Sequence, residues 1–407
     1  MGMNDTPSSE RLHIGIFGRR NAGKSSIINA ITGQNLAVVS DVKGTTTDPV
    51  LKSMELLPLG PVVLIDTPGL DDEGALGELR MKKSYQVLNK TDLALLVIDG
   101  TVGTNETEDN LIEYFIKKGV PYVLVINKAD LLTMEQIRSL QSQERFLENT
   151  IFVSATGHNN INELKELIAA KVDTTGNKKL IVGDLIAPKD VVVLVVPVDS
   201  AAPKGRLILP QQQTIRDIID AEGIVMVTKE DSLQETLDSL KQRPKMVITD
   251  SQIFKKVAKQ VPKEIALTSF SILFARYKGN LQQMVQGAAY LKKLKDSDKI
   301  LIAEGCTHHR QCEDIGTVKM PNWITAFTQK ELQFEFTSGT EFPMELQEYA
   351  MIVHCGGCML NEREMQYRIA CAKDAAVPIT NYGTCIAYMN GILERTLEVF
   401  PDVASLV

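Results

Sequence analysis

Eight residues near the N-terminus limit the folds that this chain can adopt. They read Gly18-Arg-Arg-Asn-Ala-Gly-Lys-Ser25 and complete the GxxxxGKS pattern of a phosphate-binding loop. The pattern follows the apolar run at residues 12–18 and precedes a stretch with helical spacing. A loop of this kind requires that strand–loop–helix context. Because its backbone N–H groups and the start of the helix attract phosphate, the sequence predicts a nucleotide-binding α/β domain.

Two side chains at the end of the loop have expected roles in catalysis. Lys24 is expected to reach the β- and γ-phosphates, and the Ser25 hydroxyl is expected to ligate Mg²⁺. The loop residues expected to line the nucleotide site are Gly18, Asn21, Ala22, Gly23, Lys24, Ser25 and Ser26.

A second motif is expected on the γ-phosphate side of the nucleotide. The sequence Asp66-Thr-Pro-Gly69 ends the strand predicted at residues 62–66. Asp66 can hold Mg²⁺ through a water molecule, and the Gly69 amide can meet the γ-phosphate. Asp66 and Gly69 therefore join the predicted catalytic residues.

Two later motifs predict which base is bound. Asn127-Lys128-Ala-Asp130 ends the strand predicted at 122–127, and the Asp130 carboxylate can accept hydrogen bonds from N1–H and the 2-amino group of guanine. Adenine lacks that pair of donors. Ser154-Ala155 ends the next strand, where a backbone N–H can contact the guanine O6. The order of the motifs predicts GTP as the substrate and disfavours ATP.

With these motifs the segment resembles the translation-factor-related GTPases. The stretch Gly44-Thr-Thr-Thr-Asp-Pro49 resembles the first switch of the tRNA-modifying and Era-like GTPases. By that resemblance Thr46 completes the Mg²⁺ shell and acts with the catalytic residues.

Two positions bear on the rate of hydrolysis. Leu70 stands where Ras-like enzymes carry a glutamine that orients water, so hydrolysis is expected to be slow. Asn21 stands in the loop as in potassium-activated GTPases, where this side chain helps to hold K⁺ against the phosphates. The cation would supply the positive charge that an arginine finger otherwise brings.

The remaining sequence repeats the alternation of apolar runs and helical patterns. We expect a GTP-binding domain at residues 1–172, with a parallel sheet covered on both faces, and two further α/β units at 173–265 and 266–407. Strands are predicted in the last unit at 264–270, 299–306 and 349–355. The fold class is therefore α/β, with a P-loop GTPase sheet followed by two further units.

All six cysteines lie between residues 306 and 385. A cytosolic chain keeps its thiols reduced, so such a cluster indicates metal binding or catalysis before disulfides. Cys306-Thr-His308 and His354-Cys355-Gly-Gly-Cys358 both end predicted strands, and the ends of parallel strands share one rim of a sheet. The predicted thiolate ligands are therefore Cys306, Cys355 and Cys358.

The spacing leaves the metal and its fourth ligand open. Three Cys with one His form a structural zinc set, and three Cys with an exchangeable fourth position suit a 4Fe–4S cluster. The candidates for the fourth ligand are Glu304, His308 and His354. The helical surroundings of Cys312, Cys371 and Cys385 favour a structural role for these three residues.

The combination of these segments resembles the HydF family of FeFe-hydrogenase maturation GTPases, and the middle stretch at 197–211 is also similar to that family. The resemblance implies a scaffold that receives a two-iron precursor from radical-SAM maturases and delivers it to apo-hydrogenase. It further implies that the middle unit forms a homodimer or higher oligomer. A 4Fe–4S cluster would be carried by Cys306, Cys355 and Cys358.

Composition bears on the alternatives. The longest apolar run, Val191–Val198, spans eight residues, whereas a membrane-spanning helix needs about 20. The N-terminus shows no secretory pattern. We therefore expect a cytoplasmic protein without membrane contact. A ribosome- or tRNA-associated GTPase would carry a basic RNA-binding domain. The net charge of −7 and the lack of interleaved basic and aromatic residues argue against nucleic acid. The other alternative is a zinc-bearing GTP switch.

Overall fold

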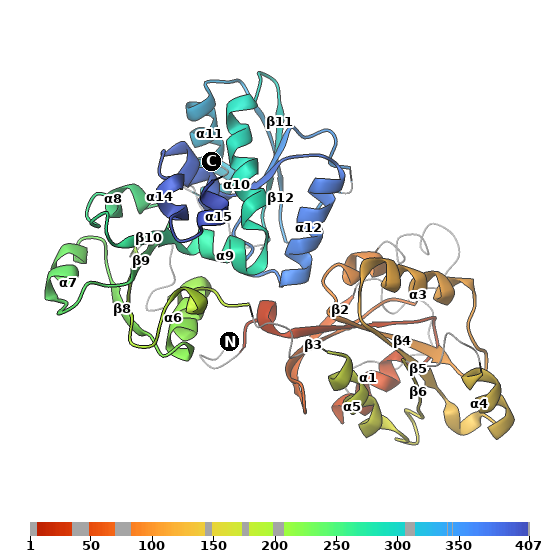
Figure 1. Ribbon diagram of the computed structural model, residues 1–407. Coiled ribbons are helices and arrows are strands. Elements are labelled where there is room, and N and C mark those ends of the chain that lie inside the picture. The colour runs from red at the N-terminus through yellow and green to blue at the C-terminus, as the bar shows by residue number, and fades with distance from the viewer. Residues whose placement is uncertain are drawn as a thin grey trace. The chain divides into compact units, whose positions relative to one another are not determined.

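The computed structural model describes residues 6–34, 49–69, 83–142, 149–172, 179–197, 207–305, 314–339, 341–343 and 345–405. The chain divides into two compact units, Met1–Asn177 and Lys178–Val407. In Figure 1 the colour runs from red to yellow-green through the first unit and from green to blue through the second.

The first unit is built on one six-stranded sheet with the order β2-β3-β1-β4-β5-β6. All neighbours in it are parallel except β2 and β3. The strands are β1 (Leu12–Phe17), β2 (Val50–Leu56), β3 (Gly60–Asp66), β4 (Leu93–Asp99), β5 (Tyr122–Asn127) and β6 (Thr150–Phe152). This arrangement confirms the predicted P-loop GTPase sheet.

Helices cover both faces of this sheet. Those with described bounds include α1 (Lys24–Thr32), α3 (Glu106–Lys118), α4 (Met134–Gln141) and α5 (Ile161–Lys171). Apolar residues of α1 and α5, such as Ile27 and Leu164, share a core with one face. Leu111 and Phe115 of α3 belong to a second core on the other face. The central strands are therefore buried on both sides, which explains their continuous Val/Ile/Leu sequences.

The second unit contains two four-stranded sheets, and every neighbouring pair in them is parallel. The first has the order β10-β9-β7-β8, and the second has the order β12-β11-β13-β14. Their strands are β7 (Val191–Val195), β8 (Ile224–Thr228), β9 (Met246–Thr249), β10 (Ala266–Ser269), β11 (Lys299–Ala303), β12 (Gln333–Thr337), β13 (Met351–His354) and β14 (Ile379–Asn381). The predicted continuation by two further α/β sheets is confirmed.

Strand β10 lies in a different sheet from the one expected. The sequence pattern assigned residues 264–270 to the same series as β11 and β13, whereas the structure pairs Ala266 with Met246 of β9. Both sheets use short, buried apolar strands, so periodicity alone does not distinguish them. The assignment depends on which neighbour the strand meets, and that is a long-range property.

The two sheets of the second unit share one core. The helices of this unit are α6 (Leu209–Asp220), α7 (Leu233–Ser239), α8 (Phe254–Val257), α9 (Phe270–Lys278), α10 (Leu281–Ala289), α11 (Met320–Thr328), α12 (Glu362–Asp374), α13 (Tyr382–Met389), α14 (Leu393–Leu397) and α15 (Pro401–Ala404). Leu194 of β7 and Ile352 of β13 belong to the same buried cluster as residues of α9 and α10. The segment from β7 to α15 therefore forms one packed body (Figure 1).

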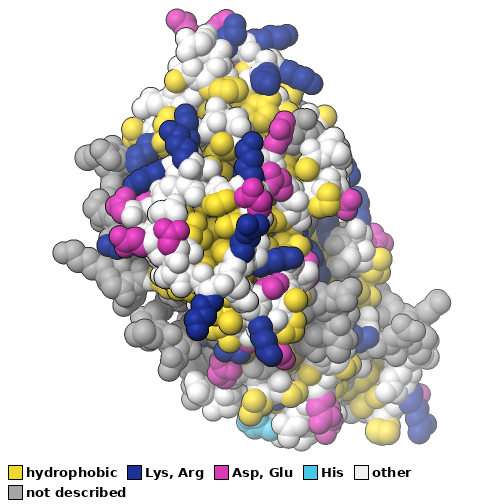
Figure 2. Space-filling view, turned by 60° about the vertical axis from the view of Figure 1, so that its left-hand side comes forward, with side chains coloured by type: hydrophobic (Ala, Val, Ile, Leu, Met, Phe, Trp, Pro, Cys, Tyr) yellow, Lys and Arg dark blue, Asp and Glu magenta, His cyan; other side chains and the backbone are white. Residues whose placement is uncertain are grey.

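The surface of the described residues mixes apolar and charged side chains. Figure 2 shows hydrophobic side chains at the surface between Lys and Arg side chains. Some of the exposed apolar residues, Ile224 and Val227, belong to β8 at the edge of its sheet. Within the described residues, the helices are too short or too polar to cross a membrane.

Candidate nucleotide and metal sites

The phosphate loop connects β1 to α1, and its glycines occupy positions that other residues would not tolerate. Gly18 and Gly23 have φ angles of 142° and 95°. A Cβ atom at Gly18 would collide with the carbonyl oxygen of Val97, and one at Gly23 would collide with the side chain of Asn127. The loop therefore packs directly on β4 and on the end of β5.

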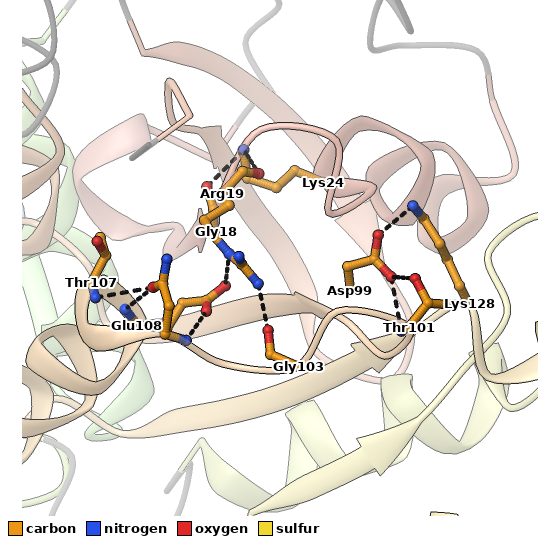
Figure 3. A network of polar contacts seen from close by, with 10 residues as sticks. Gly18, Arg19, Lys24, Asp99, Thr101, Gly103, Thr107, Glu108 and Lys128 are labelled. Atoms are coloured by element: carbon orange, nitrogen blue, oxygen red, sulfur yellow. Dashed lines mark hydrogen bonds and ion pairs between the residues drawn. The ribbon is translucent and has the colours of Figure 1, made fainter. Parts of the chain in front are cut away.

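Lys24 stands near the end of the phosphate loop, and its side chain folds back across that loop. Its Nζ donates to the carbonyl oxygens of Gly18 and Arg19, each at 2.8 Å (Figure 3). The side chain is buried, with 9% of its surface exposed. This arrangement keeps an ammonium group next to the loop, where the predicted contact with β- and γ-phosphates would be made.

The predicted Mg²⁺ ligands lie side by side. The Ser25 hydroxyl donates to Oδ2 of Asp66 at 3.5 Å, although these residues belong to different motifs. Burial raises the pKa of Asp66, while the positive charges of Lys24 and Lys52 and the Ser25 hydrogen bond oppose that shift. A divalent cation would favour the ionised carboxylate further. Thr46, the third predicted ligand, lies outside the described residues.

The backbone of the Asp66–Gly69 motif approaches the phosphate loop closely. A Cβ atom on Gly69 would lie 3.1 Å from the backbone nitrogen of Arg20. The hydroxyl of Thr67 donates to the carbonyl oxygen of Ile16 at 2.6 Å, which joins this motif to the end of β1. Asp66 and Gly69 are therefore both held beside the loop.

Asn127 connects three of the predicted motifs. Its Nδ2 donates to the carbonyl oxygen of Ala22 at 3.0 Å, and its Oδ1 accepts from the backbone N–H of Ala155 at 3.1 Å. The side chain is 3% exposed. In this way one buried amide holds the phosphate loop against the segment predicted to face the guanine O6.

The other residues of the base motifs lie at the same rim. Lys128 pairs with Asp99 at 2.5 Å from Nζ to Oδ2 (Figure 3). Asp130 lies in the short turn Ala129–Leu131 and is exposed, so its carboxylate is accessible. Ser154 is fully buried, and its Oγ accepts from the N–H of Gly157 at 3.0 Å.

The loop also contains Asn21 and Ser26. Asn21 has a φ of 59°, in the left-handed region that asparagine tolerates, and it is exposed. Ser26 follows Ser25 in the first turn of α1 and is partly exposed. Their predicted contacts with K⁺ and with the nucleotide remain predictions.

One contact at this site was not predicted from the sequence. Arg19 donates from Nε to Glu108 Oε1 at 2.9 Å and also donates to the carbonyl oxygen of Gly103 (Figure 3). Glu108 is fully buried; burial raises its pKa, and Arg19 opposes the shift. The same carboxylate accepts from the N–H of Asn105, which caps α3. The sequence signal is the capping pattern of Asn105 and Glu108.

The strands that precede the two cysteine segments, β11 and β13, are neighbours in one sheet. β11 and β13 are parallel, with Ala303 opposite His354. The N–H of Cys355 donates to the carbonyl oxygen of Ala303 at 2.8 Å. The Cys355 sulfur accepts from the N–H of Gly305 at 3.0 Å and from the N–H of Gly357 at 3.4 Å. Two such donors stabilise a thiolate and support metal ligation.

The other cysteines differ in their surroundings. Cys358 is partly buried, and burial raises the pKa of its thiol while Lys278 opposes the shift. Cys371 and Cys385 lie on α12 and α13, and Cys385 is completely buried, with a pKa raised by that burial. Cys306 and Cys312 lie outside the described residues.

Both ring nitrogens of His354 already have partners. Nδ1 lies 2.7 Å from the carbonyl oxygen of Cys355 and must donate to it, so Nε2 accepts from Arg368 at 3.1 Å. The ring is fully buried, and burial together with the charge of Arg368 lowers the pKa of His354 to about 3. As it stands, His354 offers no nitrogen lone pair to a metal, and of the two described candidates for the fourth ligand it is weaker than Glu304.

Glu304 remains the described candidate for that position. It follows β11 directly, is 5% exposed, and accepts a hydrogen bond from the Tyr382 hydroxyl at 3.1 Å. Burial and the nearby charge of Glu304 raise the pKa of Tyr382, so this phenol stays protonated and donates. His308 lies outside the described residues.

The described residues alone do not complete a metal site. Among them, no three His, Cys, Asp or Glu side chains converge to hold a metal ion. Cys306, the third predicted thiolate, follows Gly305, whose N–H donates to Cys355. A cluster site would therefore need Cys306, which lies outside the described residues, in addition to the described candidates.

Three family models match consecutive parts of the chain. A 50S ribosome-binding GTPase model matches residues 13–128, the hydrogen maturase F dimerization domain matches 181–279, and the hydrogen maturase F tetramerization domain matches 282–399. Both sheets of the second unit thus fall within maturase F domains. The chain belongs to the HydF hydrogenase maturase family. The HydF models cover the segments around Cys355 and Cys358, and the GTPase model covers the phosphate loop.

Two curated relatives match the GTPase part of the chain. GTPase Der of Kosmotoga olearia is 33% identical over 178 residues, and GTPase Der of Heliobacterium modesticaldum is 33% identical over 179 residues. The alignments cover 40% and 41% of this chain. The chain spans about two fifths of the length of these curated relatives, 40% of each.

Two solved structures match the chain with low TM-scores. A variant of Aquifex aeolicus Era bound to GDP and aluminium fluoride has a TM-score of 0.36 and 20% identity, covering 53% of this chain and 93% of that one. The G domain of the T. maritima FeoB iron transporter has a TM-score of 0.30 and 23% identity, covering 40% of this chain and 99% of that one.

Proposed function

We propose that this HydF protein hydrolyses GTP slowly, with Mg²⁺ and with activation by K⁺. The observation that carries this proposal is that Asn127 joins the phosphate loop to the base motifs, while Ser25 of that loop pairs with Asp66 of the second motif. Lys24 would bind the phosphates, and Ser25, Thr46 and Asp66 would hold Mg²⁺ directly or through water. Asn21 would hold K⁺, and Asp130 would select guanine.

Phosphate release from the full chain tests this activity. With Mg²⁺ and K⁺ we expect turnover of GTP and none of ATP, because adenine cannot donate the hydrogen-bond pair that Asp130 accepts. Replacing K⁺ by Na⁺ at equal ionic strength should slow turnover, and Asn21→Ala should remove the difference between the two salts. Equal turnover of ATP and GTP would contradict the guanine assignment, and equal rates in both salts would contradict the role of Asn21.

We further propose that the second unit carries a 4Fe–4S cluster on Cys306, Cys355 and Cys358. The N–H groups that donate to the Cys355 sulfur, at the shared ends of β11 and β13, carry this proposal. Glu304 or His308 would supply an exchangeable fourth ligand. When bound, the cluster supplies an iron site that a two-iron precursor could approach. The cargo would come from radical-SAM maturases and pass to apo-hydrogenase.

Iron and sulfide uptake under anaerobic conditions tests the cluster. We expect Cys306→Ala, Cys355→Ala and Cys358→Ala each to lose the cluster chromophore. Cys312→Ala and Cys371→Ala are matched controls that should keep it. A stoichiometric zinc site without iron uptake would refute the cluster and favour a zinc-bearing switch.

The roles divide along the chain in this proposal. Residues 1–172 would bind GTP, residues 173–265 would form the dimer, and residues 266–407 would bind the cluster. Strand β10 pairs with β9, in the first sheet of the second unit, although β10 lies just beyond the boundary at residue 265. A ribosomal role is not favoured, because the similarity to GTPase Der ends with the GTPase part, whereas the remaining sheets match maturase F domains.

A further inference from the structure

A buried lysine contacts the loop that carries the two described cysteine ligands. Lys278 is the last residue of α9 and is only 3% exposed. Its Nζ donates to the carbonyl oxygen of Leu360 at 3.1 Å and to that of Cys358 at 3.4 Å. Lysine is among the residues least often found fully buried, because its ammonium loses hydration there. The burial of Lys278 therefore indicates a specific role for its ammonium group.

The backbone of Lys278 is held in place by α12. Gln366 donates from Nε2 to the carbonyl oxygens of Lys278 and Gly279, at 3.3 and 3.1 Å. A Cβ atom on Gly279 would lie 3.3 Å from Ile369 of the same helix, so the end of α9 packs closely against it. The ammonium group is therefore positioned before any ligand binds, which reduces the entropic cost of using it.

Lys278 comes from a different part of the family architecture than the loop that it contacts. The dimerization-domain match ends at residue 279, and the tetramerization-domain match begins at 282 and contains the loop. The hydrogen bonds from Lys278 thus cross from one matched domain to the other within the second unit. They connect the end of α9 to the turn after Cys358.

The charge of Lys278 suits an anionic group at this loop. An iron–sulfur cluster held by thiolates is anionic, and its reduction potential depends on nearby charge and hydrogen bonds. A second buried cation, Arg368, contacts the same loop through His354, whose Nδ1 donates to the carbonyl oxygen of Cys355.

We propose that Lys278 is a positioning residue for the cluster, which fixes the loop of Cys355 and Cys358 and balances the negative charge of the cluster from inside the protein. This inference rests on the proposed cluster function. It assigns to the end of α9, which lies in the dimerization-domain match, a direct influence on a cluster whose proposed cysteine ligands lie in the tetramerization-domain match.

The test compares Lys278→Met, which has a similar length but lacks charge and donors, with Lys278→Arg, which keeps both. Lys278→Gln keeps an amide donor without the charge and replaces Lys278→Met if that variant does not fold, as judged by circular dichroism. Lys373→Met is the matched control, because Lys373 is exposed on α12. Full-length proteins are reconstituted anaerobically with iron and sulfide. The readouts are iron retained against a chelator and the reduction potential from an EPR-monitored titration.

We expect Lys278→Met to release half of its iron at a chelator concentration roughly tenfold lower than the wild type, within the range typical of residues that support metal ligands. The potential of the cluster that remains should move to a more negative value in Lys278→Met and Lys278→Gln. Lys278→Arg and Lys373→Met should resemble the wild type.

The outcomes separate this inference from the proposed function. Wild-type protein that takes up no iron and sulfide would refute the cluster and the inference together. A wild-type cluster with an unchanged potential in Lys278→Met or Lys278→Gln would overturn the inference alone. The same holds if Lys373→Met shifts the potential as much as the Lys278 variants, because the effect would then be general.

Discussion

At the scale of single residues, Gly356 and Gly357, which lie between Cys355 and Cys358, have different conformational constraints. Gly357 has a φ of 62° and is buried, and a Cβ atom there would lie 2.6 Å from the sulfur of Met365. Gly356 is exposed, and a Cβ atom there would meet nothing within 4 Å. The loop therefore needs glycine at its second position for shape, and leaves the first position open to solvent.

This difference predicts opposite results for two similar substitutions. Gly357→Ala should reduce iron uptake and lower the free energy of unfolding by about 1–2 kcal/mol, because a left-handed backbone disfavours a Cβ atom. A backbone that shifts to relieve this strain would also move the N–H of residue 357 away from the Cys355 sulfur. Gly356→Ala should change neither property. Iron per chain and thermal unfolding measure both. Equal loss in the two variants would show that the loop shape has no influence on metal binding.

Residue roles could be predicted from the sequence where a motif fixes the backbone. The pattern of the phosphate loop was enough to predict that Gly18 and Gly23 are needed and that Lys24 lies beside the loop. It was not enough for His354, which looked available as a ligand. Its partner Arg368 lies on α12, fourteen positions further along the chain. No local sequence pattern predicts that contact.

At the scale of elements, the first turn of α3 connects the helix to the phosphate loop. Glu108 is buried at the N-terminal end of α3, where it accepts from Arg19 and from the N–H of Asn105. Glu106 lies in the same turn and is exposed. Only one of these two acidic residues thus supports the loop.

We predict that Glu108→Gln lowers the stability of the first unit by about 2 kcal/mol or more, because it leaves the half-buried Arg19 without its carboxylate partner. GTP affinity should also fall, since Arg19 belongs to the phosphate loop. Glu106→Gln should stay within about 0.5 kcal/mol of the wild type. Hydrogen exchange of peptides from β1 in increasing urea, together with nucleotide titration, measures both effects. The prediction is contradicted if the two variants behave alike.

Elements were predictable where burial gives a continuous apolar run. The strands β1, β4, β5 and β7 have this property, and the structure has all four. The edge strands β2 and β12 were missed, because half-exposed strands carry charged residues such as Lys52 and Glu335. Strand β10 was found but assigned to the wrong sheet, since pairing depends on distant neighbours.

At the scale of the whole molecule, the two candidate sites belong to different compact units. Every GTPase motif lies within Met1–Asn177, and the cysteine segments lie within Lys178–Val407. Each site has its own core and its own supporting contacts. The maturase F domains in the second unit indicate an oligomer, in which copies of the chain would bring several such sites together.

This division predicts that the two activities can be lost one at a time. Cys355→Ala should hydrolyse GTP at nearly the wild-type rate, because the Cys355 sulfur accepts from Gly305 and Gly357 in the second unit, whereas the phosphate loop belongs to the first unit. Lys24→Ala should still take up iron and sulfide, while its GTP turnover falls roughly 10²-fold or more, as expected for loss of a charge that stabilises the transition state.

Activation of apo-hydrogenase then shows how the sites are coupled. If GTP drives an essential step, both variants should fail to activate it, each for a different reason. The coupling would have to arise from switch segments, near Thr46 and Gly69, that differ in their contacts between nucleotide states. Assays of GTP turnover, iron content and hydrogenase activation on both variants separate these steps. Loss of GTP turnover in Cys355→Ala would mean that the two units do not act as independent bodies, and the proposed division of roles would then be wrong.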